Sequence, residues 1–213
     1  MTPPTRRRLL IALALPWLAA ACGRKAPRAT PLAQGATVLA LGDSITHGTG
    51  AAPEAAYPAQ LAALTGWQVV NGGVPGDTAA QALERMPALL EAHRPALVIV
   101  SIGGNDFLRR LDEAQTEAAL RRIVALSREA GAQALLVGVP QPSVVAALGA
   151  GLADHPMYER VAQELALPLH AGGWSAVLGD ERLRSDRIHA NAAGYRAFAE
   201  GLVKTLRTTG LLP

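Results

Sequence analysis

Residues 38–48 read VLALGDSITHG, an apolar run that stops at a glycine, a carboxylate and a hydroxyl. A buried parallel strand is typically a continuous run of Val, Leu and Ala, because both of its faces are covered. Ligands of open α/β sheets bind outside the carboxyl ends of such strands. The stretch therefore predicts a central strand that delivers Ser44 to the functional edge of a sheet, although a lone serine in this place is equally typical of a turn.

Three further apolar runs follow the first at intervals close to those of a βαβ unit, and they occupy residues 68–70, 97–102 and 134–139. A parallel partner strand needs about 30 residues of chain before it can lie beside its predecessor. A short last run at residues 167–170 adds a fifth strand. The alternation of strands and helices predicts a three-layer α/β/α sandwich around a mostly parallel five-stranded sheet.

The helical patterns lie between these runs. Helices are predicted at residues 116–130 and 158–166, and Asn191 is placed to cap a last helix that reaches about Leu206. The helix before the third strand is expected in two pieces, because Pro87 interrupts its pattern. Residues 140–155, rich in proline and glycine, predict a long loop that could hold one helical turn.

The amino-terminal segment 1–21 has the layout of an export signal. Arg6–Arg8 precede the apolar run Leu9–Leu18, and three alanines follow. The run is shorter than the ~20 residues of a membrane-spanning helix. The chain of 213 residues is then divided into the signal, a tether at residues 22–35 and one domain at residues 36–213.

Cys22, the only cysteine, directly follows the signal and resembles the lipidated cysteine of a bacterial lipobox, although Leu18 stands one position too early. Lipidation would anchor the protein at the periplasmic face of a bacterial membrane through a flexible tether. The alternative is an ordinary secretory signal and a soluble periplasmic protein. The twin-arginine and general export routes both stay open, and a single cysteine forms no intramolecular disulfide.

The mature domain carries no surplus of charge. Without the three arginines of the signal, 17 basic residues stand against 17 acidic ones. A nucleic-acid-binding protein normally shows a clustered positive surplus, so the neutral charge argues against this class. The expected partner is a small-molecule substrate, and the protein is expected to be a monomer.

A serine nucleophile needs a base to take its proton and an acid to orient that base. Among five histidines, His189 alone has an acid at a suggestive spacing, because Asp186 precedes it by three residues in a loop before a capped helix. Such a turn can fold the carboxylate onto Nδ1 and leave Nε2 facing Ser44. His47, three residues after Ser44, is more typical of a loop or helix start.

Hydrogen-bond donors for an oxyanion are also present after the second and third strands. Gly76 can present its backbone N–H without a side chain in the way, and Asn105 can offer its amide. Each signal is weak when taken alone, because Gly and Asn are common turn residues.

Taken together, four short blocks resemble in order and setting the blocks of the SGNH or GDSL hydrolase family, from about Thr37 to Leu206. The blocks are Gly42-Asp43-Ser44-Ile45, Gly76, Gly104-Asn105-Asp106 and Asp186 to His189. The chain looks closest to the bacterial periplasmic subgroup of thioesterases, arylesterases and lysophospholipases. The resemblance implies a flavodoxin-like SGNH fold and a reaction without metal or cofactor.

By this resemblance Ser44 is the nucleophile, His189 the general base and Asp186 its orienting acid, while the Ser44 N–H, the Gly76 N–H and the Asn105 side chain form the oxyanion hole. The last block departs from the family pattern, with Arg187 where glycine is common and Ala190 where proline is common. The departure is expected to affect the rigidity of the loop and, with Arg182 and Arg184, the charge near the cleft.

The predicted activity is hydrolysis of carboxylic esters or thioesters through an acyl-enzyme. The substrate pocket is expected from Phe107, Leu108 and the loop from Pro140 to Met157. One alternative is a carbohydrate O-deacetylase of the cell envelope, for which few aromatic residues are available. Another is a catalytically silent lipoprotein that binds envelope glycans or lipids, which has no reason to keep nucleophile, base, acid and donors together.

Overall fold

The computed structural model describes residues 29–141 and 151–213 and contains a sheet of five parallel strands in the order β2-β1-β3-β4-β5. The predicted α/β class and parallel sheet are therefore confirmed. The strands are β1 (Thr37–Gly42), β2 (Gln68–Gly73), β3 (Leu97–Ser101), β4 (Gln133–Val137) and β5 (Leu169–His170).

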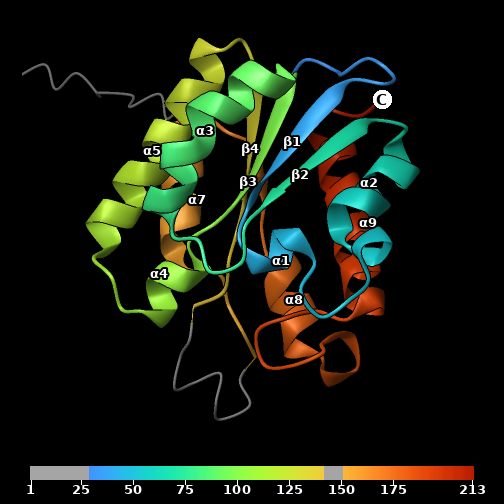
Figure 1. Ribbon diagram of the computed structural model, residues 1–213, viewed down its shortest axis with the longest axis vertical. Helices are drawn as coiled ribbons and strands as arrows, with labels where there is room; N and C mark the ends of the chain where they lie inside the picture. Colours follow the sequence, from blue (N-terminus) through green and yellow to red (C-terminus); the bar gives the residue numbers. More distant parts are fainter. Residues whose placement is uncertain (1–28, 142–150) are drawn as a thin grey trace, which may run out of the picture.

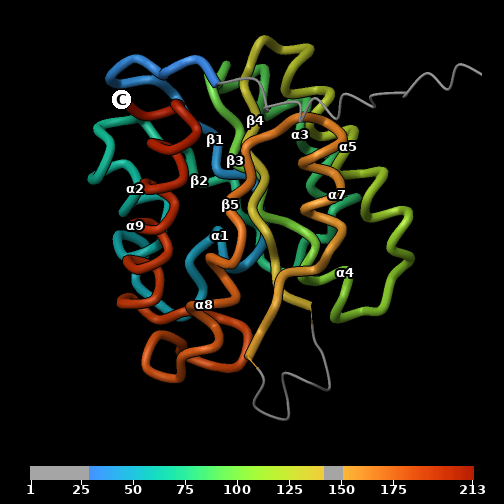
Figure 2. Tube along the Cα trace, turned by 180° about the vertical axis from the view of Figure 1, so that it is seen from behind, coloured from blue at the N-terminus to red at the C-terminus, as the bar shows by residue number. Residues whose placement is uncertain are grey.

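Helices cover both faces of the sheet and complete the predicted three layers. Figures 1 and 2 show α3, α5 and α7 on one face and α2, α8 and α9 on the other. The helices are α1 (Ser44–His47), α2 (Tyr57–Thr65), α3 (Ala79–His93), α4 (Gly104–Leu108), α5 (Glu113–Glu129), α7 (Pro156–Glu164), α8 (Gly173–Gly179) and α9 (Ala192–Thr209), with 3-10 turns at Pro53–Ala55 and Glu181–Leu183.

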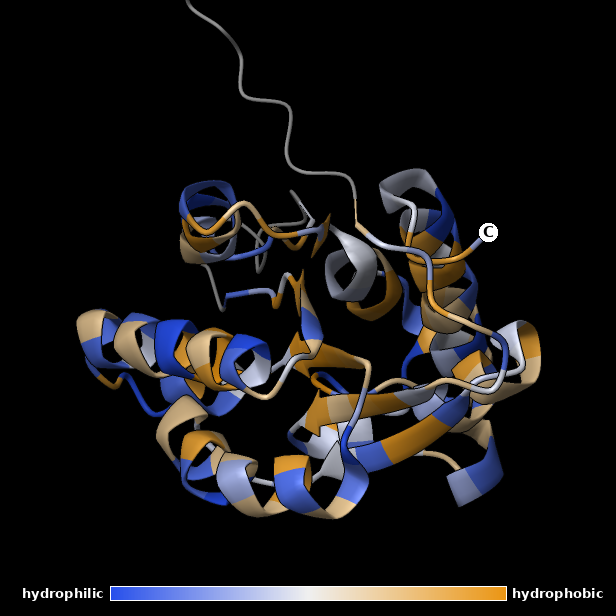
Figure 3. Ribbon diagram, turned by 90° about the horizontal axis from the view of Figure 1, so that it is seen from above, coloured by the Kyte–Doolittle hydropathy of each residue, from blue (hydrophilic) through white to orange (hydrophobic). Residues whose placement is uncertain are grey.

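The core lies between these layers because the central strands β1, β3 and β4 are apolar on both sides and the helices are apolar on one. Every residue of β3 is buried, which is typical of a central parallel strand. On α5 the buried positions recur at helical spacing, as at Leu120, Ile123 and Val124. Figure 3 shows the hydrophobic faces of the helices directed at the sheet and the hydrophilic faces directed outward.

Helix α3 is continuous from Ala79 to His93, so the prediction of two helical pieces was wrong. Pro87 lies inside the helix with its ring exposed to solvent. A helix that curves with its convex side toward solvent can accommodate a missing hydrogen bond there. The buried residues Ala82, Met86 and Leu90 hold the helix on the sheet on both sides of the proline.

The segment from Ala29 to Gly35 packs on the domain, so the predicted flexible tether does not extend over these residues. Leu32 is buried in the core, and its N–H donates to the Leu211 carbonyl at 2.9 Å. Thr30 exchanges two hydrogen bonds with the Gln133 side chain. Leu32, the apolar residue of this proline-containing stretch, therefore packs at the amino end of the sheet.

Three predictions lie outside the described residues: the export signal, the lipidation of Cys22 and most of the loop between Pro140 and His155. Within the described ranges, no helix has the length and apolarity needed to cross a membrane.

The order of the strands creates a switch point between β1 and β3. From β1 the chain winds outward to β2, and it then crosses back to β3 on the other side of β1. Connections from β1 and β3 therefore leave in opposite directions and open a crevice at the carboxyl ends, where ligands of doubly wound sheets bind. Ser44 follows β1 and Asn105 follows β3 at this crevice.

The buried His170 makes the stability of the fold depend on pH. Its Nδ1 lies 2.7 Å from Thr205 Oγ1, while Nε2 is buried without a partner in the described chain. Burial lowers the pKa of His170 from 6.5 to about 4. Between these values the unfolded chain binds a proton that the folded chain does not, so stability falls as the pH falls through this window.

We expect the free energy of unfolding to drop by up to about 3 kcal/mol between pH 7.5 and 4 through His170 alone. Urea denaturation of the parent and of His170→Asn at several pH values measures this slope. The variant is expected to be less stable at pH 7.5 but to lose less stability on acidification. An equal slope in both proteins would contradict the assignment.

Candidate active site

Ser44 lies at the carboxyl end of the central strand, at the first residue of the short helix α1. Asp43 caps this helix, since its Oδ1 accepts a hydrogen bond from the Ile45 N–H at 3.1 Å. A side chain at Gly42 would lie 2.0 Å from Thr46 Oγ1, so the close turn admits only glycine. The strand, the turn and the cap together fix the serine at the crevice.

Ser44, His189 and Asp186 form a continuous chain of hydrogen bonds. His189 Nε2 lies 3.0 Å from Ser44 Oγ, and His189 Nδ1 lies 2.8 Å from Asp186 Oδ2. Ser44 and His189 lie 145 residues apart in the sequence. The geometry allows the imidazole to take a proton from the serine while the carboxylate holds the ring.

The loop that carries His189 is held by its own backbone. The Ser185 N–H donates to the His189 carbonyl at 2.9 Å. Asp186 Oδ1 accepts from the Ile188 N–H at 2.8 Å and from the His189 N–H at 2.9 Å. Partial burial raises the pKa of Asp186, but these hydrogen bonds and the one from the imidazole outweigh it, so the pKa lies below its ordinary value. The carboxylate stays charged beside the imidazole.

Two backbone donors are available at the site. In the described part of the chain, neither the Ser44 N–H nor the Gly76 N–H donates to a backbone or side-chain acceptor. Gly76 has a φ of 86°, a conformation that other residues rarely adopt, and its carbonyl accepts from Arg109 at 2.8 Å. Gly76 does not itself line the cleft described below.

The Asn105 amide already has partners. Its Nδ2 donates to the Asp77 carbonyl at 3.0 Å and, in a longer contact, to Asp43 Oδ2 at 3.3 Å. Donation to a substrate oxyanion would replace the longer contact. Because both partners belong to the turns after β1 and β2, the amide is fixed between the serine and Gly76.

Asp43 is a buried carboxyl under the serine. Only 3% of its surface is exposed, and burial raises its pKa to about 7 despite the hydrogen bond from Ile45 and the nearby imidazole of His189. Its cap on α1 gives Asp43 a structural role. Asn71 holds the second turn in the same way, because its Oδ1 accepts from the Gly73 N–H at 3.0 Å.

Arg85 on α3 ties the turns after β1 and β2 together and was not found from the sequence. Its guanidinium contacts Asp77 Oδ2 at 2.7 Å, the Gly72 carbonyl at 2.8 Å and the Gly42 carbonyl at 2.9 Å. The available signal was an arginine two residues before a proline, which is common on exposed helix faces. Only the packing of α3 over the strand ends reveals its role.

Replacing Arg85 by methionine is expected to lower the free energy of unfolding by about 3 kcal/mol, because two carbonyls and a carboxylate lose a charged donor. Turnover should fall as well, since both turns of the site loosen. The matched control is Arg122→Met, which removes one exposed pair with Glu129 and should cost at most about 0.5 kcal/mol. Urea denaturation checks both values, and equal losses would contradict the role of Arg85.

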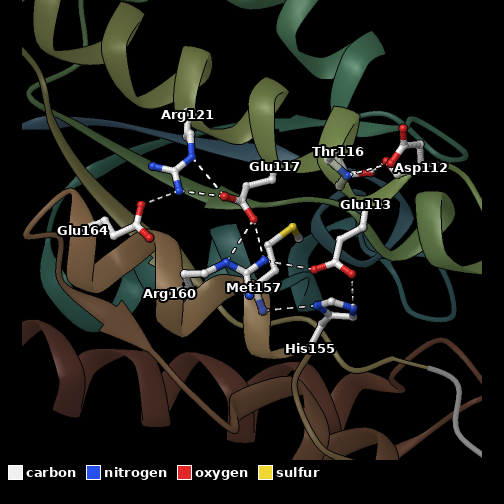
Figure 4. Close-up of polar contacts among 10 residues, drawn as sticks. Asp112, Glu113, Thr116, Glu117, Arg121, His155, Met157, Arg160 and Glu164 are labelled. Carbon is white, nitrogen blue, oxygen red and sulfur yellow. Dashed lines mark hydrogen bonds and ion pairs between the residues drawn. The ribbon is translucent and has the colours of Figure 1, made fainter.

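An ion-pair network holds α7 against α5, as Figure 4 shows. Arg121 contacts Glu117 at 2.7 Å and Glu164 at 2.6 Å, and Arg160 joins Glu113 to Glu117. The two arginines hold the pKa of Glu117 below its ordinary value through their hydrogen bonds. The network therefore links the second half of α7 to α5.

A cleft of about 200 Å³ opens beside Ser44. Its described lining is mainly apolar, with Ser44, Asp43 and Asn105 on one side and Arg187 at the mouth. The apolar part comprises Ile45, Leu108, Val139, Pro140, Leu152, Leu178 and Ile188.

Two of the four residues expected in the substrate pocket are elsewhere. Leu108 and Pro140 line the cleft, whereas Met157 is fully buried in the core and Phe107 stacks on His155 with ring centroids 4.5 Å apart. Met157 is turned inward because α7 begins at Pro156 and packs that face on the sheet side. The expectation for these two was wrong.

The other histidines stay apart from Ser44. His47 ends α1, His93 ends α3, His155 caps α7 and His170 is buried beside Thr205. No group of three or more His, Cys, Asp or Glu side chains suited to a metal ion occurs among the described residues.

A model of the GDSL-like lipase/acylhydrolase family matches residues 40–197 of the chain. The Escherichia coli K12 protein named thioesterase 1/protease 1/lysophospholipase L1 is 36% identical over 176 residues, which cover 80% of this chain and 83% of that protein. The Pseudomonas aeruginosa protein named esterase TesA is 37% identical over 118 residues, 53% of this chain and 59% of that protein.

Solved structures agree with these sequence matches. The crystal structure of TesA has a TM-score of 0.71 at 32% identity and covers 81% of this chain and 99% of its own. AlinE4, an SGNH-hydrolase family esterase, has a TM-score of 0.64 at 27% identity and covers 83% of this chain and 95% of its own.

Proposed function

The chain belongs to the GDSL-like lipase/acylhydrolase family and is a hydrolase of ester bonds, and we propose that it works as a serine esterase through Ser44, His189 and Asp186. The observation that carries this proposal is the contact of 3.0 Å between His189 Nε2 and Ser44 Oγ, continued at 2.8 Å to Asp186. The apolar cleft opens directly beside this serine.

In the proposed reaction, Ser44 Oγ attacks the acyl carbonyl while His189 Nε2 takes its proton. The tetrahedral oxyanion accepts hydrogen bonds from the Ser44 N–H, the Gly76 N–H and the Asn105 amide. The bond to the leaving alcohol or thiol then breaks, and His189 returns the proton to that group. Water hydrolyses the acyl-enzyme by the same steps, with His189 again as the base.

The proposed substrates are carboxylic esters or thioesters with an apolar acyl group. The described cleft lining is largely aliphatic, and the names of the relatives include esterase, thioesterase and lysophospholipase. A carbohydrate O-deacetylase is less well supported, because no aromatic side chain for sugar stacking lines the described cleft.

The test combines a covalent probe with a substrate series. A fluorophosphonate should label the parent protein at Ser44 and leave Ser44→Ala unlabelled. The rates on p-nitrophenyl esters of increasing chain length, on acyl-CoA and on an acetylated sugar then identify the substrate class. Labelling of both proteins alike, or hydrolysis of the acetylated sugar alone, would contradict the proposal.

We also propose that the protein is exported and anchored through a lipid on Cys22. The support is the order of Arg6–Arg8, the apolar run, the three alanines and the cysteine. Metabolic labelling with a fatty-acid analogue should mark the parent and not Cys22→Ser. A soluble, unlabelled parent protein in the periplasm would support the alternative of an ordinary secretory signal.

A further inference from the structure

Arg187 stands at the mouth of the cleft, between the acid and the base of the proposed triad. It lines the cleft together with Ser44, Leu178 and Ile188, and its side chain is exposed. It is the only cationic residue of the described lining. The lining contains one carboxyl, that of Asp43, which is buried under the serine.

No carboxylate neutralises Arg187. All seventeen Asp and Glu residues of the chain lie within the described ranges 29–141 and 151–213, and none of them forms an ion pair with Arg187 there. The two other arginines of the same segment are paired, Arg182 with Asp180 at 2.7 Å and Arg184 with Glu181 at 2.5 Å. Of the three positive charges, only the one at the cleft lacks a partner in the described chain.

The backbone of Arg187 is fixed relative to the reacting groups. The turn around it is closed by the hydrogen bond from the Ser185 N–H to the His189 carbonyl. Asp186 Oδ1 accepts two more hydrogen bonds from backbone N–H groups of the same turn. Binding of an anion by Arg187 therefore requires ordering of one side chain and no rearrangement of the loop.

We propose that Arg187 forms an anion subsite of the cleft, which binds a carboxylate or phosphate group that the ester substrate carries near its scissile bond. A guanidinium matches both anions with two parallel hydrogen bonds. The proposal rests on the proposed esterase function and narrows its substrate class to esters with an anionic group close to the reacting carbonyl.

Two pairs of matched esters test the subsite. In the first pair, 4-acetoxybenzoate and its methyl ester differ by a carboxylate on the leaving group. In the second, the p-nitrophenyl monoester of glutaric acid and p-nitrophenyl pentanoate differ by a carboxylate on the acyl group. The substitution Arg187→Gln is compared with Arg182→Gln, which removes a paired arginine of the same segment from outside the cleft.

We expect Arg187→Gln to raise KM for at least one anionic ester about tenfold, with KM for its neutral partner and kcat for both almost unchanged. In Arg187→Lys, KM for the anionic ester should rise less than in Arg187→Gln, because lysine keeps the positive charge but cannot form the two parallel hydrogen bonds of a guanidinium. The ester pair whose KM changes shows whether the anion is bound on the leaving group or on the acyl group.

Two results would overturn the subsite: equal shifts for anionic and neutral esters, or the same shift in Arg182→Gln. Hydrolysis of the neutral esters by all variants reports the Ser44 site separately, so failure of the subsite and failure of the proposed function give different results.

Discussion

His189→Ala is expected to lower kcat on a p-nitrophenyl ester by about 10⁴- to 10⁶-fold, because no other group of the described chain reaches Ser44 Oγ as a base. Without the imidazole the hydroxyl keeps its proton, and the residual rate comes from the oxyanion donors and from binding. Steady-state kinetics together with a burst experiment measure the loss and locate it in the acylation step.

The control for this prediction is His47→Ala. His47 lies three residues after Ser44 and is exposed, and only its backbone contacts the site. Its removal should change kcat less than about threefold, since surface groups outside a site contribute little. The double variant Ser44→Ala, His189→Ala should be no slower than either single variant, because the residues act as one unit. Additive losses would contradict the proposed pairing.

Asn105→Ala is expected to reduce kcat by about 10²- to 10³-fold, which corresponds to the loss of one oxyanion donor, ~2.7 to 4 kcal/mol. The effect should fall on kcat and leave KM nearly unchanged, because the oxyanion exists only after attack. Inhibition by a phosphonate that mimics the tetrahedral intermediate should weaken in parallel with kcat.

Gln141→Ala is a suitable control for Asn105→Ala. Gln141 also carries an amide and lines the cleft, and it forms no hydrogen bond with Ser44, His189 or Asp43 in the described chain. Its removal should leave kcat within about threefold of the parent. A loss in Asn105→Ala that appears only as lower thermal stability would indicate that the amide merely holds the turns of Asp43 and Asp77.

Local patterns in the sequence were sufficient to predict the sheet. The buried strands are continuous apolar runs, and Asn191 caps the last helix as the sequence predicts. The effect of Pro87 was predicted wrongly because helix propensities describe an isolated helix. In the folded protein, the buried residues on either side of Pro87 pack on the sheet, and the helix continues through the proline. Burial of Leu32 could not be predicted, because its partner Leu211 lies at the other end of the chain.

The site was predicted from residues with distinctive chemistry. The features that the sequence did not reveal involve residues without such a pattern. A serine, a histidine and an acid at a spacing of three form a pattern that predicts chemistry. Arg85 acts on backbone carbonyls of distant turns, and nothing in its neighbours indicates this contact. A loop pattern cannot show which face of α7 turns inward, so the burial of Met157 in the core could not be predicted.

The docking of Ala29 to Leu32 determines how the enzyme can be attached to a solid support. The Ala29 N–H donates to the Thr209 carbonyl and the Leu32 N–H to the Leu211 carbonyl, at the end of the sheet where Figure 1 marks the C-terminus. The cleft beside Ser44 lies at the opposite end, at the carboxyl ends of the strands. A bead coupled upstream of Ala29 would therefore sit on the side of the molecule away from Ser44. Immobilised enzyme of this kind should hydrolyse bulky esters at the rate of the free protein, whereas coupling through the loop of His189 should block them.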